Sequence, residues 1–197
     1  MRPAKSNSSS TARERGFSLI EVMISMGLLT IVSLSVAQLF AISTHSNLLS
    51  RGSTSTTALA EQRLEQLRAL PWGFATDGTG LPVSDTTTNL AVTPANATGS
   101  GLNPSPSDAL DRNTTGLVDY LDANGVWLGT GTTPPAGTVY IRRWSITPLP
   151  TNPNNTLILQ VFVSPLAIEI TRGTSTAARE RLPGEAWLVS VKTRRAP

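Results

Sequence analysis

Between Phe17 and Ser43 the chain has 27 residues and only one formal charge, that of Glu21. After Glu21, no Asp, Glu, Lys or Arg follows until Arg51. A bilayer core of about 30 Å is crossed by roughly 20 apolar helical residues, so this segment is long enough to span a membrane. It is also longer than the apolar region of an ordinary secretory signal, which has about 7–15 residues. We therefore expect residues 17–43 to form a retained membrane helix.

The carboxylate of Glu21 is the unusual feature of this predicted helix. A charge inside a membrane helix costs about 2.5–3.5 kcal/mol on insertion scales, so we expect the carboxylate to have a partner. An amino group is the nearest plausible one. The alternative is an uncleaved signal anchor of a single-pass protein. That alternative accounts for neither Glu21 nor the abrupt junction between Gly16 and Phe17.

The polar segment before the apolar helix, residues 1–16, carries four basic residues and one acid. An excess of Lys and Arg before a span predicts a cytoplasmic N-terminus, with the rest of the chain outside the inner membrane. Without residues 1–16, the chain has 12 basic and 12 acidic residues and no formal net charge. The high pI is therefore poor evidence for nucleic-acid binding, and we do not expect nucleic acid as a partner.

The run Gly16-Phe17-Ser18-Leu19-Ile20-Glu21-Val22-Met23 resembles the processing site of type IV prepilins and of type II secretion pseudopilins. The resemblance implies that a prepilin peptidase cuts after Gly16 and that the same enzyme methylates the new amine of Phe17. It also implies that Glu21 is the acid kept inside the assembled fibre. In a low-dielectric fibre core the ammonium and the carboxylate would attract strongly, and either one left unpaired would be costly.

Residues 44–71 read as a continuation of the helix with one apolar face. Ala60, Leu64 and Leu67 follow i, i+4, i+7 spacing, and Leu59 and Leu70 widen the stripe. We expect this face to pack on a sheet through Leu64, Leu67 and Leu70. The charged residues between them are expected on the exposed side, where Glu65 pairs with Arg68; these residues are Glu61, Arg63, Glu65 and Arg68.

Pro71 is expected to end the helix, because proline lacks an amide donor and crowds the preceding turn. Gly52 and the Ser/Thr run at 53–57 are expected to weaken the middle of the helix.

Residues 72–197 predict a globular, β-rich head. Its first part, residues 73–116, is rich in Gly, Thr, Ser, Asn, Ala and Pro and predicts a long irregular loop. Apolar, β-branched and alternating segments then predict an antiparallel sheet of about four or five strands; these segments are residues 117–121, 126–128, 138–146, 156–163, 166–170 and 187–192. Asn124-Gly125 predicts a type I′ hairpin turn. The fold class is α+β, a pilin fold by resemblance.

Few residues of the chain point to chemistry. The chain has no cysteine, so it forms no disulfide, although many major pilins close a C-terminal loop with one. His45 is the only histidine and cannot make a metal centre alone. Asp119, Asp122 and Asn124 resemble part of a calcium loop, but the alternating pattern and closing acid are missing, so a hairpin turn is favoured.

Two basic clusters, Arg142-Arg143 and Lys192/Arg194/Arg195, are expected to be solvated strand edges and a charged tail. We therefore predict no catalytic residue, metal or cofactor, and a protein that is not an enzyme.

A second resemblance involves the helix end, residues 64–72, and the strand at 140–146, which are similar to V-type minor pilins and to I-type minor pseudopilins of type II secretion. The leading hypothesis is a minor pilin, a structural subunit that primes or joins a type IV pilus. Its partners would be the prepilin peptidase/methyltransferase, other minor pilins, the major pilin and the inner membrane, and after assembly it would lie in a pilus on the cell surface. The alternatives are a minor pseudopilin and a membrane-tethered surface-binding protein.

Overall fold

The computed structural model of the 197-residue chain describes residues 16–172 and 181–194. Of residues 1–16, the leader that is predicted to be cleaved off, only Gly16 lies inside this described part. The chain divides into two compact units, Met1–Ser46 and Asn47–Pro197. The second unit contains the sheet and the last part of the long helix.

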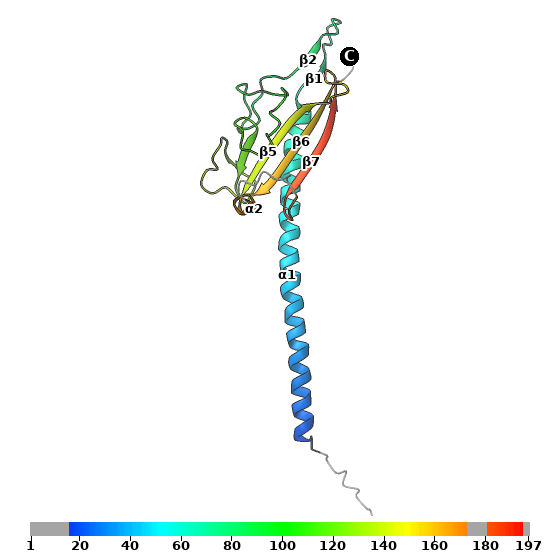
Figure 1. Cartoon of the computed structure of the whole chain (residues 1–197), viewed down its shortest axis with the longest axis vertical. Coiled ribbons are helices and arrows are strands. Elements are labelled where there is room, and N and C mark those ends of the chain that lie inside the picture. Colours follow the sequence, from blue (N-terminus) through cyan, green and yellow to red (C-terminus); the bar gives the residue numbers. More distant parts are fainter. Residues whose placement is uncertain (1–15, 173–180, 195–197) are drawn as a thin grey trace, which may run out of the picture. The chain divides into compact units, whose positions relative to one another are not determined.

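Helix α1 runs without interruption from Leu19 to Ala69, 51 residues, and ends two residues before Pro71 (Figure 1). The helix continues through Gly52 and residues 53–57, so the weakening predicted there does not break it. Hydroxyl groups bond to the preceding turn there: Thr54 Oγ1 donates to the Ser50 carbonyl at 3.0 Å, and Thr56 Oγ1 donates to the Gly52 carbonyl at 3.1 Å. Such bonds hold the hydroxyl against the backbone of the preceding turn.

The head contains a five-stranded antiparallel sheet in the order β4-β3-β5-β6-β7, as expected for the α+β class. The strands are β3 (Val118–Leu121), β4 (Trp127–Gly129), β5 (Tyr140–Pro148), β6 (Thr156–Pro165) and β7 (Ala186–Thr193). Figure 1 shows β5, β6 and β7 as long neighbouring strands. Strands β5 and β6 pair over nine residues from Tyr140↔Pro165 to Pro148↔Leu157, and β7 pairs with β6 over eight.

The core lies between the sheet and the last turns of α1. Leu64 and Leu67 are buried in it, and Leu70 is half-buried against it. Strand β6 contributes every second residue to this face: Leu157, Leu159, Val161 and Val163. This alternation follows from the two-residue period of a strand.

Residues 73–116 are mostly irregular, as expected, but part of this segment packs into the core. Strands β1 (Trp72–Phe74) and β2 (Pro82–Ser84) form a separate antiparallel hairpin. Farther on, the irregular segment buries apolar side chains, among them Leu90, Ala91, Leu102, Ala109 and Leu110. Asp85 organises the turn before them, because its carboxylate accepts hydrogen bonds from the amides of Thr87 and Thr88 and from the Thr88 hydroxyl.

The predicted strand at residues 166–170 is wrong, because this segment is the helix α2 (Leu166–Arg172). Strand β6 ends at Pro165, and the Leu166 amide then donates to the Val139 carbonyl at 2.8 Å. Alternation over only five residues does not separate a strand from one helical turn, in which Leu166 and Ile170 lie on one face. Leu166 packs against a small buried cluster of Val118, Tyr120 and Ile141, whereas Ile170 is exposed.

The predicted type I′ turn at Asn124-Gly125 is also wrong. A type I′ turn needs positive φ at both central residues, but only Gly125 has it, at 78°. The Asp122 amide donates to the Val126 carbonyl, and the Gly125 amide donates to the Asp122 carbonyl. The loop between β3 and β4 therefore has three central residues with glycine in the left-handed position.

Candidate assembly segment and polar networks of the head

The peptide bond between Gly16 and Phe17 lies in an exposed, non-helical stretch just before α1. Gly16, Phe17 and Ser18 have no regular secondary structure, and Phe17 is 83% exposed. The helix starts when the Ser18 carbonyl accepts hydrogen bonds from the amides of Glu21 at 3.0 Å and Val22 at 3.2 Å. This bond is therefore accessible and outside the helical hydrogen-bond ladder, as a protease substrate must be.

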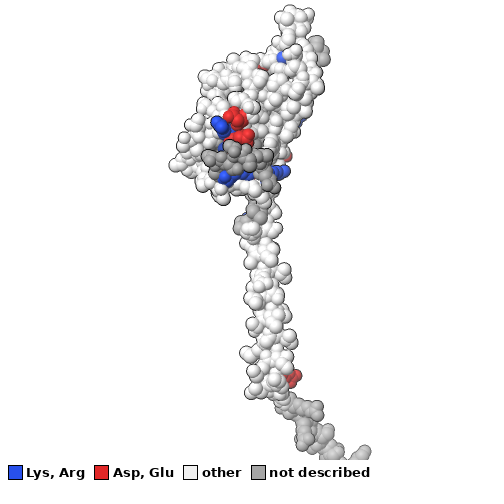
Figure 2. Space-filling model, viewed as in Figure 1, with Lys and Arg blue, Asp and Glu red and all other residues white. Residues whose placement is uncertain are grey.

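Glu21 lies in the first turn of α1 and is exposed. The unpaired amides at a helix start carry partial positive charge, so an acid is electrostatically favoured there. Figure 2 shows a long white helix surface with a single acidic patch near its start, and Glu21 is the only charged residue between Phe17 and Ser50. Within residues 16–172 and 181–194, no ion pair includes Glu21. Its carboxylate therefore has no charged partner within the described part of the chain.

The surface of α1 up to Ser46 is apolar and uncovered. Every residue from 16 to 46 is exposed. The helix is long enough and apolar enough to cross a membrane. Its large exposed side chains include Leu19, Ile20, Met23, Ile24, Met26, Leu28, Leu29, Ile31, Leu34, Leu39, Phe40 and Ile42. A continuous apolar surface of this kind requires lipid or protein around it.

Three hydroxyl groups on this apolar surface form hydrogen bonds within the helix. Thr30 Oγ1 donates to the Met26 carbonyl at 2.8 Å, and Ser35 Oγ and Thr44 Oγ1 each donate to the carbonyl four residues earlier at 2.9 Å. Because a hydroxyl without a hydrogen bond is costly in an apolar medium, these bonds make the helix compatible with burial. Glu21 is the one charged residue of residues 17–43.

Residues 11–37 match the family model of the prokaryotic N-terminal methylation motif. The match supports a type IV pilin-like protein. It includes Gly16, Phe17 and Glu21, and it implies processing by a prepilin peptidase and assembly into a pilus or pseudopilus. No curated protein and no solved structure matched the chain.

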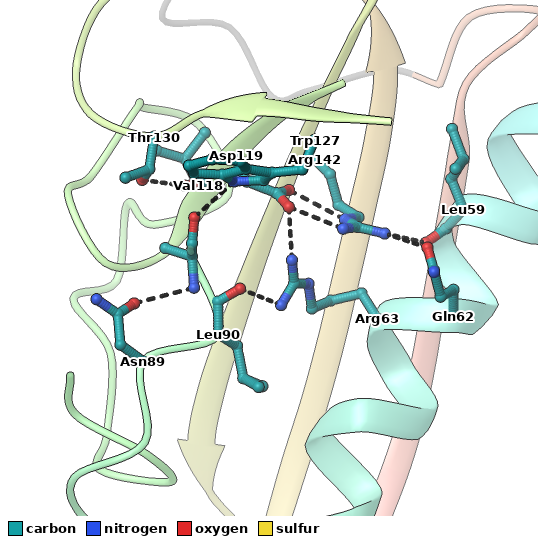
Figure 3. A network of polar contacts seen from close by, with 11 residues as sticks. Leu59, Gln62, Arg63, Asn89, Leu90, Val118, Asp119, Trp127, Thr130 and Arg142 are labelled. Atoms are coloured by element: carbon teal, nitrogen blue, oxygen red, sulfur yellow. Dashed lines mark hydrogen bonds and ion pairs between the residues drawn. The ribbon is translucent and has the colours of Figure 1, made fainter. Parts of the chain in front are cut away.

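A buried ion network connects α1 to the sheet (Figure 3). The fully buried carboxylate of Asp119, on β3, accepts hydrogen bonds from two arginines. Arg63 Nη2 lies 2.5 Å from Oδ2. Arg142 donates from Nε to Oδ1 at 3.0 Å and from Nη2 to Oδ2 at 2.8 Å. Arg142 Nη1 also reaches back to α1, at 3.0 Å from the Leu59 carbonyl oxygen and from Gln62 Oε1.

The surroundings of Arg63 explain why the predicted exposure of this residue is wrong. Arg63 is 2% exposed, and its guanidinium lies 4.4 Å from the centre of the Trp144 ring. It also donates to the Leu90 carbonyl, and nearby Trp127 Nε1 donates to the Ala91 carbonyl at 3.0 Å. Burial lowers the pKa of Arg63 to about 10, against the opposing effect of Asp119, so the side chain remains charged at neutral pH.

Arg142 and Arg143 are likewise buried and do not form the predicted solvated strand edge. Both lie on β5, which has a neighbouring strand on each side. Arg143 donates to Asn113 Oδ1 at 2.9 Å and pairs with Glu169 at 3.0 Å. The pairs continue from Glu169 to Arg172 and from Arg172 to Glu185, so a second network joins β5, α2 and the start of β7.

Arg194 is bound to the head and is not part of a solvated tail as predicted; Arg195 lies outside the described residues. The Arg194 guanidinium stacks 3.7 Å from the centre of the Trp72 ring. It donates to the carbonyls of Gly73 at 3.0 Å and Val83 at 3.1 Å, and to Ser84 Oγ at 3.2 Å. One arginine thus fastens the end of β7 to the β1–β2 hairpin without a disulfide.

The carboxylates of Asp119 and Asp122, which resemble part of a calcium loop in sequence, contact different partners. Asp119 is occupied by the two arginines, and Asp122 Oδ1 accepts from the amides of Asn124 and Val126, each at 2.8 Å. The arrangement is that of a capped hairpin loop. Among the described residues, no cluster of three or more His, Cys, Asp or Glu side chains is arranged to hold a metal ion.

Proposed function

We propose that the chain is a minor pilin, a structural subunit that primes a type IV pilus or is incorporated into it. The observation that carries the proposal is the position of the methylation motif at residues 11–37, directly on an exposed apolar helix with one acid in its first turn. In this proposal residues 17–43 first anchor the chain in the inner membrane, with the head in the periplasm, and later pack against other subunits.

The chemistry of the N-terminus gives Glu21 its role. Cleavage after Gly16 creates an α-ammonium on Phe17, and a prepilin peptidase then methylates it. Residues 17 and 21 are about one helical turn apart, so the ammonium and the carboxylate can meet within one subunit or between neighbours. Attraction between two buried charges is strongest at close approach, so pairing between neighbours sets the axial register of adjacent helices. The protein itself performs no reaction in this proposal.

Intact mass measurement tests processing. The protein purified from its native membrane is expected to lack residues 1–16 and to carry one additional methyl group. Gly16→Ala is expected to leave the longer, unprocessed chain, whereas Gly27→Ala, another open glycine of the same segment, should be processed normally. A native protein that still begins at Met1 in functional assemblies would refute the proposal.

Assembly is tested separately by shearing pili from the cells. The mature protein is expected in the sheared fraction, and Glu21→Val is expected to remain in the membrane although it is processed. A Glu21→Val variant that retains the protein's function without entering pili would instead favour a membrane-tethered binding protein. Dependence of protein secretion, and not of pili, on the chain would favour a minor pseudopilin.

A further inference from the structure

Strand β7 leaves one edge of the head sheet open. Within residues 16–172 and 181–194, it is the last strand in the order β4-β3-β5-β6-β7 and pairs only with β6. The Arg194 amide donates to the Asn155 carbonyl, one residue beyond the pair Thr193↔Thr156. Counting back from Arg194, the backbone N–H and C=O groups of every second residue of β7 therefore point toward β6. The N–H and C=O groups of the intervening residues, Trp187, Val189, Val191 and Thr193, therefore point away from the sheet. Among the described residues, none of these groups has a hydrogen-bond partner.

The two edges of the same sheet differ in a way that indicates a docking strand. Strand β4 has three residues, and the register shifts where it pairs with β3, which are usual protections of an edge. Strand β7 has eight residues, an unbroken register with β6 and no proline. Its only charged side chain, Lys192, donates to the Arg68 carbonyl on α1. The charge therefore does not protect the edge from pairing with another strand.

Two side chains beside the open edge are apolar and exposed. Val189 and Val191 are 59% and 58% exposed, and they lie opposite Gln160 and Ile158 of β6. Outward donors and acceptors recur every second residue, about 6.8 Å apart along an antiparallel strand. A second extended strand matches this spacing, and its own alternate side chains would cover the two valines.

We propose that β7 pairs with an edge strand from the head of a different pilin-type subunit. This rests on the proposed function, which brings subunits with parallel α1 helices side by side. A subunit that repeated along a fibre by this contact would need a second edge able to pair with β7, and the other edge of this sheet is β4, which has three residues and a register shift. The contact therefore suits a single partner placed beside this subunit, and it adds backbone hydrogen bonds between heads to the packing of the helices.

A photo-crosslinker tests the proposal in the native host. The full chain carries p-benzoylphenylalanine in place of Val191, and adducts are identified by peptide mass spectrometry. We expect an adduct with a β-strand of another pilin-type subunit. Placing the probe at Ser190, on the opposite face of β7, is expected to give much less of it, because successive side chains of a strand point to opposite faces.

Substitutions at Val189 show whether the backbone edge makes the contact. Val189→Pro removes one outward N–H without removing a bond to β6, and prolines of this kind are tolerated on edge strands. We expect about a tenfold loss of adduct, as for one intermolecular hydrogen bond. Val189→Lys should give a similar loss by placing a charge on the edge, whereas Val189→Thr keeps the N–H and the β-branched shape and should retain the adduct.

Each result has a definite meaning. Absence of the adduct, an adduct with a second copy of this chain, or equal yields in the Pro, Lys and Thr variants would overturn the docking proposal. Leader cleavage and recovery in sheared pili are followed in the same cells. If both occur without the adduct, only the docking proposal fails. If neither occurs, the proposed function fails and the docking proposal fails with it.

Discussion

Replacement of Asp119 by alanine removes the one carboxylate shared by two buried arginines. Three charge-assisted hydrogen bonds are lost, from Arg63 Nη2 and from Arg142 Nε and Nη2. Arg63 and Arg142 are 2% and 3% exposed, so water does not replace the lost partner. Removing one member of a buried ion pair typically costs about 3–5 kcal/mol. We therefore expect Asp119→Ala to lower the free energy of unfolding of the head by about 4 kcal/mol.

The assay is denaturant unfolding of the full-length protein in detergent micelles, followed by tryptophan fluorescence, because Trp144 lies under Arg63. The matched control is Glu65→Ala, which breaks the Arg68–Glu65 pair of 2.8 Å, with side chains 52% and 67% exposed. Exposed pairs of this kind contribute about 0–1 kcal/mol. If Asp119→Ala costs no more than Glu65→Ala, the network does not stabilise the head and our interpretation of it is wrong.

Three further predictions concern the parts of the head around the core. Gly101→Ala should destabilise the head more than Gly78→Ala does: both glycines have positive φ, but only at Gly101 would the added Cβ lie 2.4 Å from a backbone oxygen, that of Asp85, and thermal unfolding of the two variants compares them. Burial acts to raise the pKa of Asp85, but hydrogen bonds from Thr88 and Thr87 outweigh it and lower the pKa. The stabilisation is therefore complete above the unfolded pKa of about 3.9 and is lost as the pH falls through the lower folded value. The protection factors of the Thr87 and Thr88 amides, which correct for the intrinsic pH dependence of exchange, should therefore fall only in that acidic range; a loss of protection that starts near neutral pH would contradict this. Arg194→Gln should accelerate amide exchange in the β1–β2 hairpin and change Trp72 fluorescence while β5 and β6 stay protected, and an unchanged hairpin would show that the arginine does not hold it.

The long elements could be predicted because their patterns are long. The apolar run from Phe17, the stripe through Ala60, Leu64 and Leu67, and the end near Pro71 together define α1, and the fold class follows from the β-rich segments after it. The short segments were less predictable. At residues 166–170 five alternating residues fit a strand and a helical turn equally well, and the pattern alone does not indicate that this segment is the helix α2.

The buried charges were missed for a different physical reason. Arg63 stands within the apolar stripe, three residues after Ala60 and four before Leu67, and Asp119 is the one acid in the apolar run at 117–121. Each residue alone reads as a solvated charge, because an unpaired buried charge is costly. Their opposite signs at core-facing positions were the available signal, but the pairing depends on Arg63 and Asp119 being brought together across 56 residues of chain.

The hydrogen bonds between α1 and the sheet have a mechanical consequence. Apolar contacts are non-directional and let surfaces slide, whereas the bonds from Arg63 to Asp119 and from Arg142 to Leu59 and Gln62 lengthen as soon as the helix shifts along its axis. A force that pulls the helix along its axis is thus resisted first by these few guanidinium contacts between α1 and the sheet.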